Sequence, residues 1–318
     1  MVLGAGASVG YGLPTGAQLT AWLTQWYDQG SVPGEFARLL GDDVGSFVEF
    51  SKRFRESGYY SVDSFLGKQS EAEARLVRVG TKAIAYHIAE KENPENFLRA
   101  GNGADWYRLL WNSLSSEAKH WTDLGQNNLQ VITFNYDRSL EAYLFSRAKS
   151  TWDLTDEDAF KALELIPISH VYGALQPLGS SDAATTRRYG PIRSVDALDH
   201  AAGAIKLMYS ARAETAVELH TAWFSFADQV IWLGFGFDLL NVDQLGYKSA
   251  IAPRFTWNGG SWEGRSLESY MMTRGISEAR VSRIFERMGH VLGKPIPLAR
   301  ETGAIEIEQA LLGWDCLH

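Results

Sequence analysis

The amino-acid sequence predicts an α/β protein built on a parallel sheet flanked by helices. Short apolar segments alternate with amphipathic segments, and each apolar segment ends in glycine or polar residues. This alternation is typical of βαβ units, in which helices cover a parallel sheet. A long stretch without strand character follows the first strand and helix. We therefore expect a Rossmann-like parallel sheet flanked by helices, with an all-helical insertion after its first βα unit.

The chain opens with a strand, a glycine-rich turn and a helix. Met1-Val2-Leu3 is apolar, and the turn that follows contains glycine at positions 4, 6, 10 and 12. Thr15 is a good N-cap for a helix that carries Leu19 and Leu23 on one face. This order of elements is the one found where a sheet binds a dinucleotide.

Residues 32–124 show helical spacing only. Apolar residues recur three or four positions apart, as in Phe47, Phe50 and Phe54, and glycine or Asn-Pro pairs separate the runs. We expect four or five helices here. The chain then divides into a sheet domain of residues 1–31 and 125–318 and a helical insertion of residues 32–124.

Strand character returns after residue 125. We predict strands at 129–134, 166–171 and 229–233 and helices at 136–147, 213–228 and 277–291. Residues 173–191 are rich in small and polar side chains and are predicted to form a mobile loop. Ligands of parallel sheets bind outside the carboxyl ends of the strands, so the residues that follow each strand are the candidates for a site.

Composition excludes several classes of protein. The only cysteine among the 318 residues is Cys316, which excludes an internal disulfide framework and a multi-cysteine zinc site. No apolar run is long enough to cross a bilayer and no signal peptide precedes the first strand, so we expect a cytoplasmic protein. The net charge of −8 gives no support for nucleic-acid binding.

The glycine turn is the first candidate for a binding site. Without side chains, Gly4, Ala5 and Gly6 let a backbone approach a pyrophosphate closely, and Ser8 adds a hydroxyl donor. No acidic residue ends a second strand about 20 residues on, so the usual dehydrogenase pattern is incomplete. The alternative is a tight turn with a structural role only.

Three further segments follow predicted strands. Thr133-Phe134-Asn135-Tyr136-Asp137 places an amide at a strand end, with Asp137 as a ligand or a helix cap. His170 and Tyr172 lie two apart, so on a strand they face the same side, and His170 is a candidate general base or a structural histidine. The last predicted strand is followed by Gly234, Gly236 and Asp238. Asp238 is a candidate either to accept hydrogen bonds from ribose hydroxyls or to cap the next helix.

These four segments, in this order, resemble the sirtuin superfamily and specifically its bacterial branch of sirtuin-like NAD⁺ hydrolases. The matching motifs are Gly-Ala-Gly-x-Ser with Gly-Leu-Pro after it (residues 4–14), Thr-x-Asn-Tyr-Asp (residues 133–137), a strand ending in a His-Gly-like motif, and the glycine-rich strand end at 233–238. Two features depart from the family pattern. Tyr172 stands where the catalytic histidine directly precedes the glycine, and the four zinc-binding cysteines of protein-deacylating members are absent.

The resemblance implies that NAD⁺ is the substrate and that no metal takes part. Its pyrophosphate would lie on Gly4 to Ser8 and its adenosine ribose near Gly234 to Asp238, with Thr133, Asp137 and Tyr172 also at the cofactor. Asn135 would orient water or the ribose hydroxyls, and His170 would act as general base while water attacks C1′. The products are ADP-ribose and nicotinamide.

Relatives of this type are toxic effectors of antiphage defence. They deplete cellular NAD⁺ on infection, a response called abortive infection. The resemblance implies activation by homo-oligomer assembly or by a separate partner such as an ATPase, an Argonaute-like protein or a sensor. Two alternatives remain: a catalytically weak module that binds NAD⁺ or ADP-ribose, favoured by Tyr172, and an assembly subunit whose aromatic-rich helical insertion docks on a partner. Protein deacylation is the least favoured reading.

Overall fold

The computed structural model describes residues 1–27, 32–69, 71–99, 105–207, 214–237, 239–258, 261–264 and 267–271, and short pieces between 283 and 302. The helices are α1 Gly16–Thr24, α2 Gly34–Leu40, α3 Val44–Ser57, α4 Val62–Leu66, α5 Ala74–Ala89, α6 Asn96–Arg99, α7 Trp106–Ser115, α8 Ser139–Trp152, α9 Asp156–Glu164, α10 Val195–Ala204, α11 Glu214–Phe226, α12 Leu239–Gln244 and α13 Tyr247–Ile251. The strands are β1 Val2–Leu3, β2 Val131–Thr133, β3 Ile168–His170, β4 Gln229–Leu233, β5 Phe255–Asn258, β6 Ser261–Gly264, β7 Glu268–Met271, β8 His290–Val291, β9 Lys294–Pro295 and β10 Ala299–Thr302.

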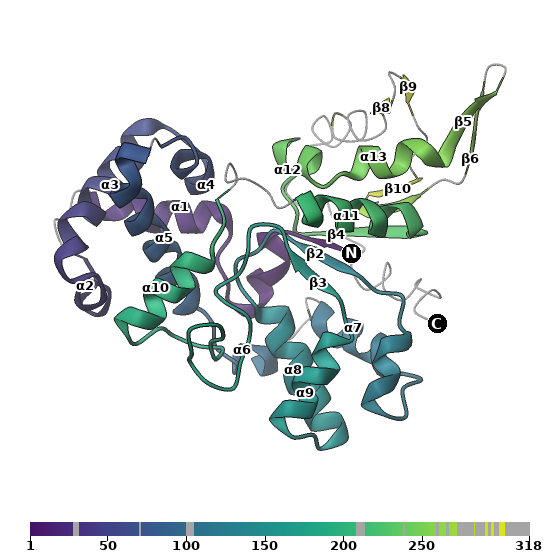
Figure 1. Cartoon of the computed structure of the whole chain (residues 1–318), viewed down its shortest axis with the longest axis horizontal. Helices are drawn as coiled ribbons and strands as arrows, with labels where there is room; N and C mark the ends of the chain where they lie inside the picture. The colour runs from purple at the N-terminus through teal and green to yellow at the C-terminus, as the bar shows by residue number, and fades with distance from the viewer. Residues whose placement is uncertain are drawn as a thin grey trace.

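The core of the fold is a parallel sheet with the strand order β10-β7-β4-β1-β2-β3. Strand β1 lies inside it and pairs in parallel with β2 and β4, so Leu3 stands opposite both Thr133 and Leu233. The carboxyl ends of these three strands therefore meet at one edge of the sheet (Figure 1). The predicted α/β fold class is confirmed.

Helices cover both faces of the sheet. Helices α11 and α13 pack together on one side, while α7, α8 and α9 lie on the other (Figure 1). Trp232 of β4 is fully buried, with the ring of Tyr247 from α13 at 5.6 Å and the ring of Phe224 from α11 at 6.3 Å. Aromatic residues of such size account for much of the apolar area that a core buries.

The stretch between β1 and β2 is helical. Helices α1 to α5 form a cluster around Phe36. The centroid of its ring lies 5.1 Å from that of Phe47 and 4.5 Å from that of Tyr86. In the described part of residues 32–124 six α-helices begin, α2 to α7, where four or five were expected, and α4 and α6 are short. Helix α10 packs on α5 and α7 packs on α8, so contacts cross the predicted boundaries at residues 32 and 124. The division into domains stays a prediction.

Local signals placed strands β1 to β4 and helices α1, α8 and α11, but not α12, α13, β5 to β7 or β10. The strand at 229–233 coincides with β4, and Thr15 caps α1 through a capping box with Gln18. The strands predicted at 129–134 and 166–171 contain β2 and β3 but are longer than them. Helices α9 and α10 were not predicted. The helix expected at 277–291 falls mostly outside the described residues, and its last two residues form β8.

The segment 173–191 is irregular, as expected, but buried charges anchor it. Glu92, three residues after the end of α5, accepts hydrogen bonds from Arg138 at 2.8 Å and from Arg187 at 2.5 Å, and all three side chains are buried. Arg138 also donates to the carbonyl oxygens of Arg187 and Arg188. The expected mobile loop is therefore attached to the body of the molecule, because buried charges persist only when they are paired and hydrogen-bonded.

Candidate active site

A cavity of about 220 Å³ opens at the carboxyl ends of β1, β2 and β4. Parallel sheets bind their ligands at this edge, which makes the cavity the candidate site. Residues from the sheet and from the helical stretch line it: Gly4, Ala5, Pro14, Thr15, Gly16, Leu19, Ser61, Asp63, Ile88, Phe134, Asn135, Tyr136, Asp137, Tyr172, Phe235, Gly236 and Asn241. Among the described residues, no lysine, arginine or histidine lines this cavity.

The glycine turn packs against the end of β4. The amides of Gly4 and Gly6 donate to the carbonyl oxygens of Leu233 and Gly234 at 2.9 and 3.0 Å. A Cβ atom on Gly4 would lie 2.6 Å from the Gly234 oxygen, so glycine is needed here for contact between two loops. The Ala5 amide is the one in this Gly-Ala-Gly segment with no acceptor among the described residues. Gly4 and Ala5 line the cavity, whereas Gly6 and Gly234 lie behind its wall.

A buried polar network supports the cavity from behind. Ser8 Oγ accepts a hydrogen bond from Asn135 Nδ2 at 3.1 Å and donates to Asp137 Oδ1 at 3.3 Å. Asp137 Oδ1 also accepts from the amide of Ser139 at 3.0 Å and from its hydroxyl. Burial raises the pKa of Asp137, although the Ser139 hydrogen bonds oppose that rise. Ser8 thus contacts protein side chains rather than the cavity.

Asn135 stands where β2 ends, and one of its polar atoms has no protein partner. Its amide nitrogen atoms are used, since the backbone N–H donates to Thr133 Oγ1 at 3.1 Å and Nδ2 donates to Ser8. Its Oδ1 atom is buried without a hydrogen bond. Buried acceptors in folded proteins nearly always have a donor, so this atom marks a place for a donor from water or a ligand. Thr133 supports the turn and does not reach the cavity.

Aromatic side chains form another part of the wall. Phe134 lies between Tyr172 and Phe235, with ring centroids 5.6 and 4.9 Å away. The Tyr172 hydroxyl lies 2.6 Å from Asn241 Oδ1 and 2.7 Å from Gln244 Oε1, and its single proton is donated to one of these two oxygens. Gly236 lines the cavity beside them, and Asp238 lies outside the described residues.

His170 does not line the candidate cavity, whereas Asn135 and Tyr172 do. It faces a separate cavity of about 580 Å³ between β3, α8, α9 and the segment after β3. Its Nδ1 is 2.8 Å from the Asn135 carbonyl oxygen and its Nε2 is 2.5 Å from Glu141 Oε1. The expectation that His170 and Tyr172 share one face is wrong. Strand β3 ends at His170, so the alternation of a strand does not extend to residue 172.

Glu141 controls the charge of His170. Burial alone lowers the pKa of His170, but attraction and hydrogen bonding to Glu141 outweigh it, and the pKa is raised. In the same way, burial favours the neutral form of Glu141, yet His170 holds the pKa of that carboxyl below its usual range. Both ring nitrogens of His170 already have partners, and the ring holds the Asn135 backbone in place.

Asp63 is a site residue that sequence reasoning missed. It lies in α4 of the helical stretch, and its Oδ1 accepts a hydrogen bond from the Tyr136 hydroxyl, while Asp63 itself lines the cavity. Burial raises its pKa, although the hydrogen bond from Tyr136 opposes the rise. Asp63 is 72 positions from Asn135 in the sequence and carries no motif, so only the tertiary fold reveals the pair.

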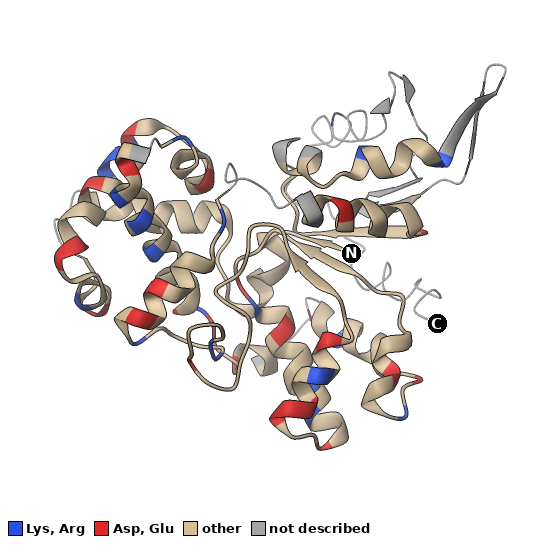
Figure 2. Cartoon of the chain, in the orientation of Figure 1, with Lys and Arg blue, Asp and Glu red and all other residues tan. Residues whose placement is uncertain are grey.

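The ionisable carboxyl groups that line the cavity give it an acidic lining. Strands β1 to β4 carry no Lys, Arg, Asp or Glu, and these residues lie mainly on helices and loops (Figure 2). Two carboxyl groups, Asp63 and Asp137, line the cavity and no cation opposes them there. An acidic lining attracts positive charge on a ligand or a transition state. The described residues hold no group of three His, Cys, Asp or Glu side chains able to bind a metal.

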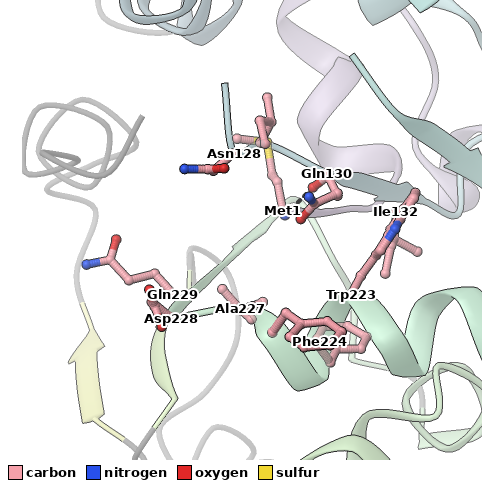
Figure 3. A pocket seen from close by; sticks show the side chains of 12 residues that line it. Met1, Asn128, Gln130, Ile132, Trp223, Phe224, Ala227, Asp228 and Gln229 are labelled. Carbon is pink, nitrogen blue, oxygen red and sulfur yellow. Dashed lines mark hydrogen bonds between the residues drawn. The ribbon is translucent and has the colours of Figure 1, made fainter. Parts of the chain in front are cut away.

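Another cavity, of about 360 Å³, lies at the opposite edge of the sheet (Figure 3). Met1, Gln130 and Trp223 line it, near the amino ends of β1 and β2. Ligands of parallel sheets rarely bind at this edge, so it is the weaker candidate.

None of the described helices is long and apolar enough to cross a bilayer.

Of the residues expected at the site, the candidate cavity brings together Gly4, Ala5, Asn135, Asp137, Tyr172 and Gly236. Gly6, Ser8, Thr133 and Gly234 support its walls, and His170 faces elsewhere. Searches for related proteins match neither a protein-family model nor a curated protein.

Proposed function

We propose that this chain is a sirtuin-like NAD⁺ hydrolase that releases nicotinamide and ADP-ribose. The observation that carries the proposal is the cavity at the carboxyl ends of β1, β2 and β4. It is lined by the Gly-Ala-Gly turn and by Asn135, which has an unsatisfied buried acceptor. The acidic lining adds support, because the nicotinamide ring is cationic and glycosidic cleavage passes through an oxocarbenium-like state.

The size of the cavity is consistent with the proposal that it holds one end of the substrate. Its 220 Å³ is below the roughly 300–1,000 Å³ of typical ligand pockets, which fits a nicotinamide riboside end and not a whole dinucleotide. The pyrophosphate would then lie toward Ala5, whose amide is free to donate. The adenosine end would extend past Gly236.

The side chains support a division of roles. Asn135 Oδ1 accepts a hydrogen bond from the attacking water or a ribose hydroxyl. His170 acts through Asn135, whose carbonyl oxygen it contacts at 2.8 Å, and is therefore a positioning residue. Water attacks C1′, the bond to nicotinamide breaks with its electron pair moving to the ring nitrogen, and one proton is released.

By the same resemblance, we propose that the activity depletes NAD⁺ in bacterial antiphage defence. Assembly into a homo-oligomer would switch it on, so the pure chain is expected to become active as its concentration rises. This part of the proposal rests on the motifs at residues 4–14 and 133–137 alone.

A second candidate function is a module that binds NAD⁺ or ADP-ribose without cleaving it. The observation in its favour is that no histidine lines the cavity, and that Tyr172 holds the family's histidine position with its hydroxyl bound to Asn241 and Gln244.

Nicotinamide release separates the two functions. The pure chain, assayed over a range of concentrations, is expected to release nicotinamide from NAD⁺, and Asn135→Ala to lower the rate by about 100-fold or more. His170→Ala is expected to lower it less, because it acts through Asn135. Binding of NAD⁺ without release would favour the second candidate, and unchanged release by both variants would disprove the assigned roles.

A further inference from the structure

The candidate cavity needs a base, and the histidine expected to supply it lies elsewhere. His170 faces another cavity, and its two ring nitrogens contact Glu141 and the Asn135 carbonyl. Four titratable side chains line the candidate cavity within the described part of the chain: Asp63, Tyr136, Asp137 and Tyr172.

Three of these four are committed to other contacts. The Tyr136 hydroxyl donates to Asp63, and the Tyr172 hydroxyl donates to Asn241 or Gln244. Asp137 accepts three hydrogen bonds on one oxygen, from Ser8 and twice from Ser139, in the network behind the wall. These bonds tie Asp137 through its Oδ1 to the network behind the cavity wall.

Asp63 has the surroundings of a base. It is half-buried in the first turn of α4, where Ser61 caps the helix and also lines the cavity. The Tyr136 hydroxyl orients one carboxylate oxygen, and Tyr136 is the direct neighbour of Asn135 in the chain. Burial raises the pKa of the carboxyl, which makes its ionised form a stronger proton acceptor.

We propose that Asp63 is the general base of the reaction, so that the helical stretch completes the active site. This inference rests on the proposed NAD⁺ hydrolysis. The oxygen of water bonds to C1′ of the ribose while the bond from C1′ to nicotinamide breaks and its electron pair moves to the ring nitrogen. A proton of the attacking water passes to a carboxylate oxygen of Asp63 and from there to solvent, so NAD⁺ and water give ADP-ribose, nicotinamide and one proton.

The test compares Asp63→Asn with Asp42→Asn, a matched change at an exposed acid of the same helical stretch. Nicotinamide release at saturating NAD⁺ and NAD⁺ binding by calorimetry are measured for each. Asp63→Asn is expected to lower kcat by about 100-fold or more and to change NAD⁺ affinity by less than about threefold. Asp42→Asn is expected to change neither, and Asp63→Glu to regain part of the rate.

The outcomes separate the inference from the function. Release by Asp63→Asn at the wild-type rate overturns the role of Asp63 and leaves NAD⁺ hydrolysis standing. An equal loss of affinity and rate overturns the role as base, because it would make Asp63 a binding residue. A wild-type chain that releases no nicotinamide overturns the proposed function and the inference with it. Circular dichroism of Asp63→Asn and Asp63→Glu shows whether a loss of rate comes from misfolding.

Discussion

At the scale of single residues, the glycines of the first turn have a structural duty that the sequence motif does not reveal. Gly4, Gly6 and Gly234 lie so close that any Cβ would overlap the backbone of the opposite loop. Gly234 also has φ at +57°, a conformation that other residues adopt at a cost of about 1–3 kcal/mol. The motif therefore holds the ends of β1 and β4 together, and the cavity forms in front of that contact.

A pair of glycine substitutions tests this view. Gly234→Ala would place a Cβ 1.9 Å from the amide nitrogen of Ala7, so we expect it to lower the free energy of unfolding by about 3 kcal/mol or more. Gly236→Ala meets nothing within 4 Å and is expected to stay within about 0.5 kcal/mol of wild type. Urea unfolding followed by tryptophan fluorescence measures both. Equal stability of the two variants would show that the contact between the loops contributes little.

Residues of the site were predictable where they lie next to a strand end. Asn135 and Asp137 follow β2 directly, and local sequence alone places them at the carboxyl edge. The role of Ser8 was not predictable, since its partners come from residues 135–139, more than 120 positions away. Asp63 shows the same limit, because its proximity to Tyr136 depends on how α4 packs and not on any pattern near residue 63.

At the scale of elements, periodicity and caps predicted four strands of the sheet, β1 to β4, but not β7, β10 or most of the connections. Strand β4 was predicted at its full length because the apolar run that forms most of it ends directly before a glycine. Strand β3 is shorter than predicted, since the chain turns after His170, and that single difference moves Tyr172 to another cavity. Helix α10 has a Ser194 cap, yet it follows a glycine-rich loop and its packing on α5 was not visible in the sequence.

The contact between β3 and α8 predicts a pH-dependent stability. The pKa of His170 is raised above its ordinary 6.5, so its charged pairing with Glu141 stabilises the fold fully below pH 6.5 and is lost as the pH rises through the raised pKa. Glu141 has a lowered pKa, so its contribution is present above its ordinary 4.5 and is lost as the pH falls further. The pairing is strongest between these two values.

His170→Gln therefore should lower the unfolding temperature most at about pH 5.5, between the two ordinary values, and progressively less as the pH rises through the raised pKa of His170. A hydrogen bond to a charged group contributes about 1.5–3 kcal/mol, so the difference at pH 5.5 is a few degrees. Thermal unfolding at half-unit pH intervals measures it. His200→Gln, an exposed change on α10, serves as the matched control and should leave the unfolding temperature unaltered. A difference for His170→Gln that does not vary with pH would contradict the pairing.

At the scale of the whole molecule, the candidate cavity joins two parts of the chain. Its walls come from the strand ends on one side and from α1, the Ser61–Asp63 region and Ile88 on the other. Hydrogen bonds already link these two parts, as between Tyr136 and Asp63 and between Arg138 and Glu92. A ligand in the cavity would add further contacts to both parts and so stabilise their association.

Saturating NAD⁺ is accordingly expected to stabilise the whole chain. At 100 times its Kd a ligand adds about 2.7 kcal/mol to the folded state, which corresponds to roughly 5 °C in unfolding temperature for a chain of this size. A non-cleaving variant such as Asp63→Asn keeps the NAD⁺ intact during the measurement. Because the cavity spans both parts, hydrogen exchange should slow in α4 and in the residues after β2 together. Protection confined to one side would show that NAD⁺ binds away from this cavity, and the same result with adenosine monophosphate alone would place the bound group at the adenosine end.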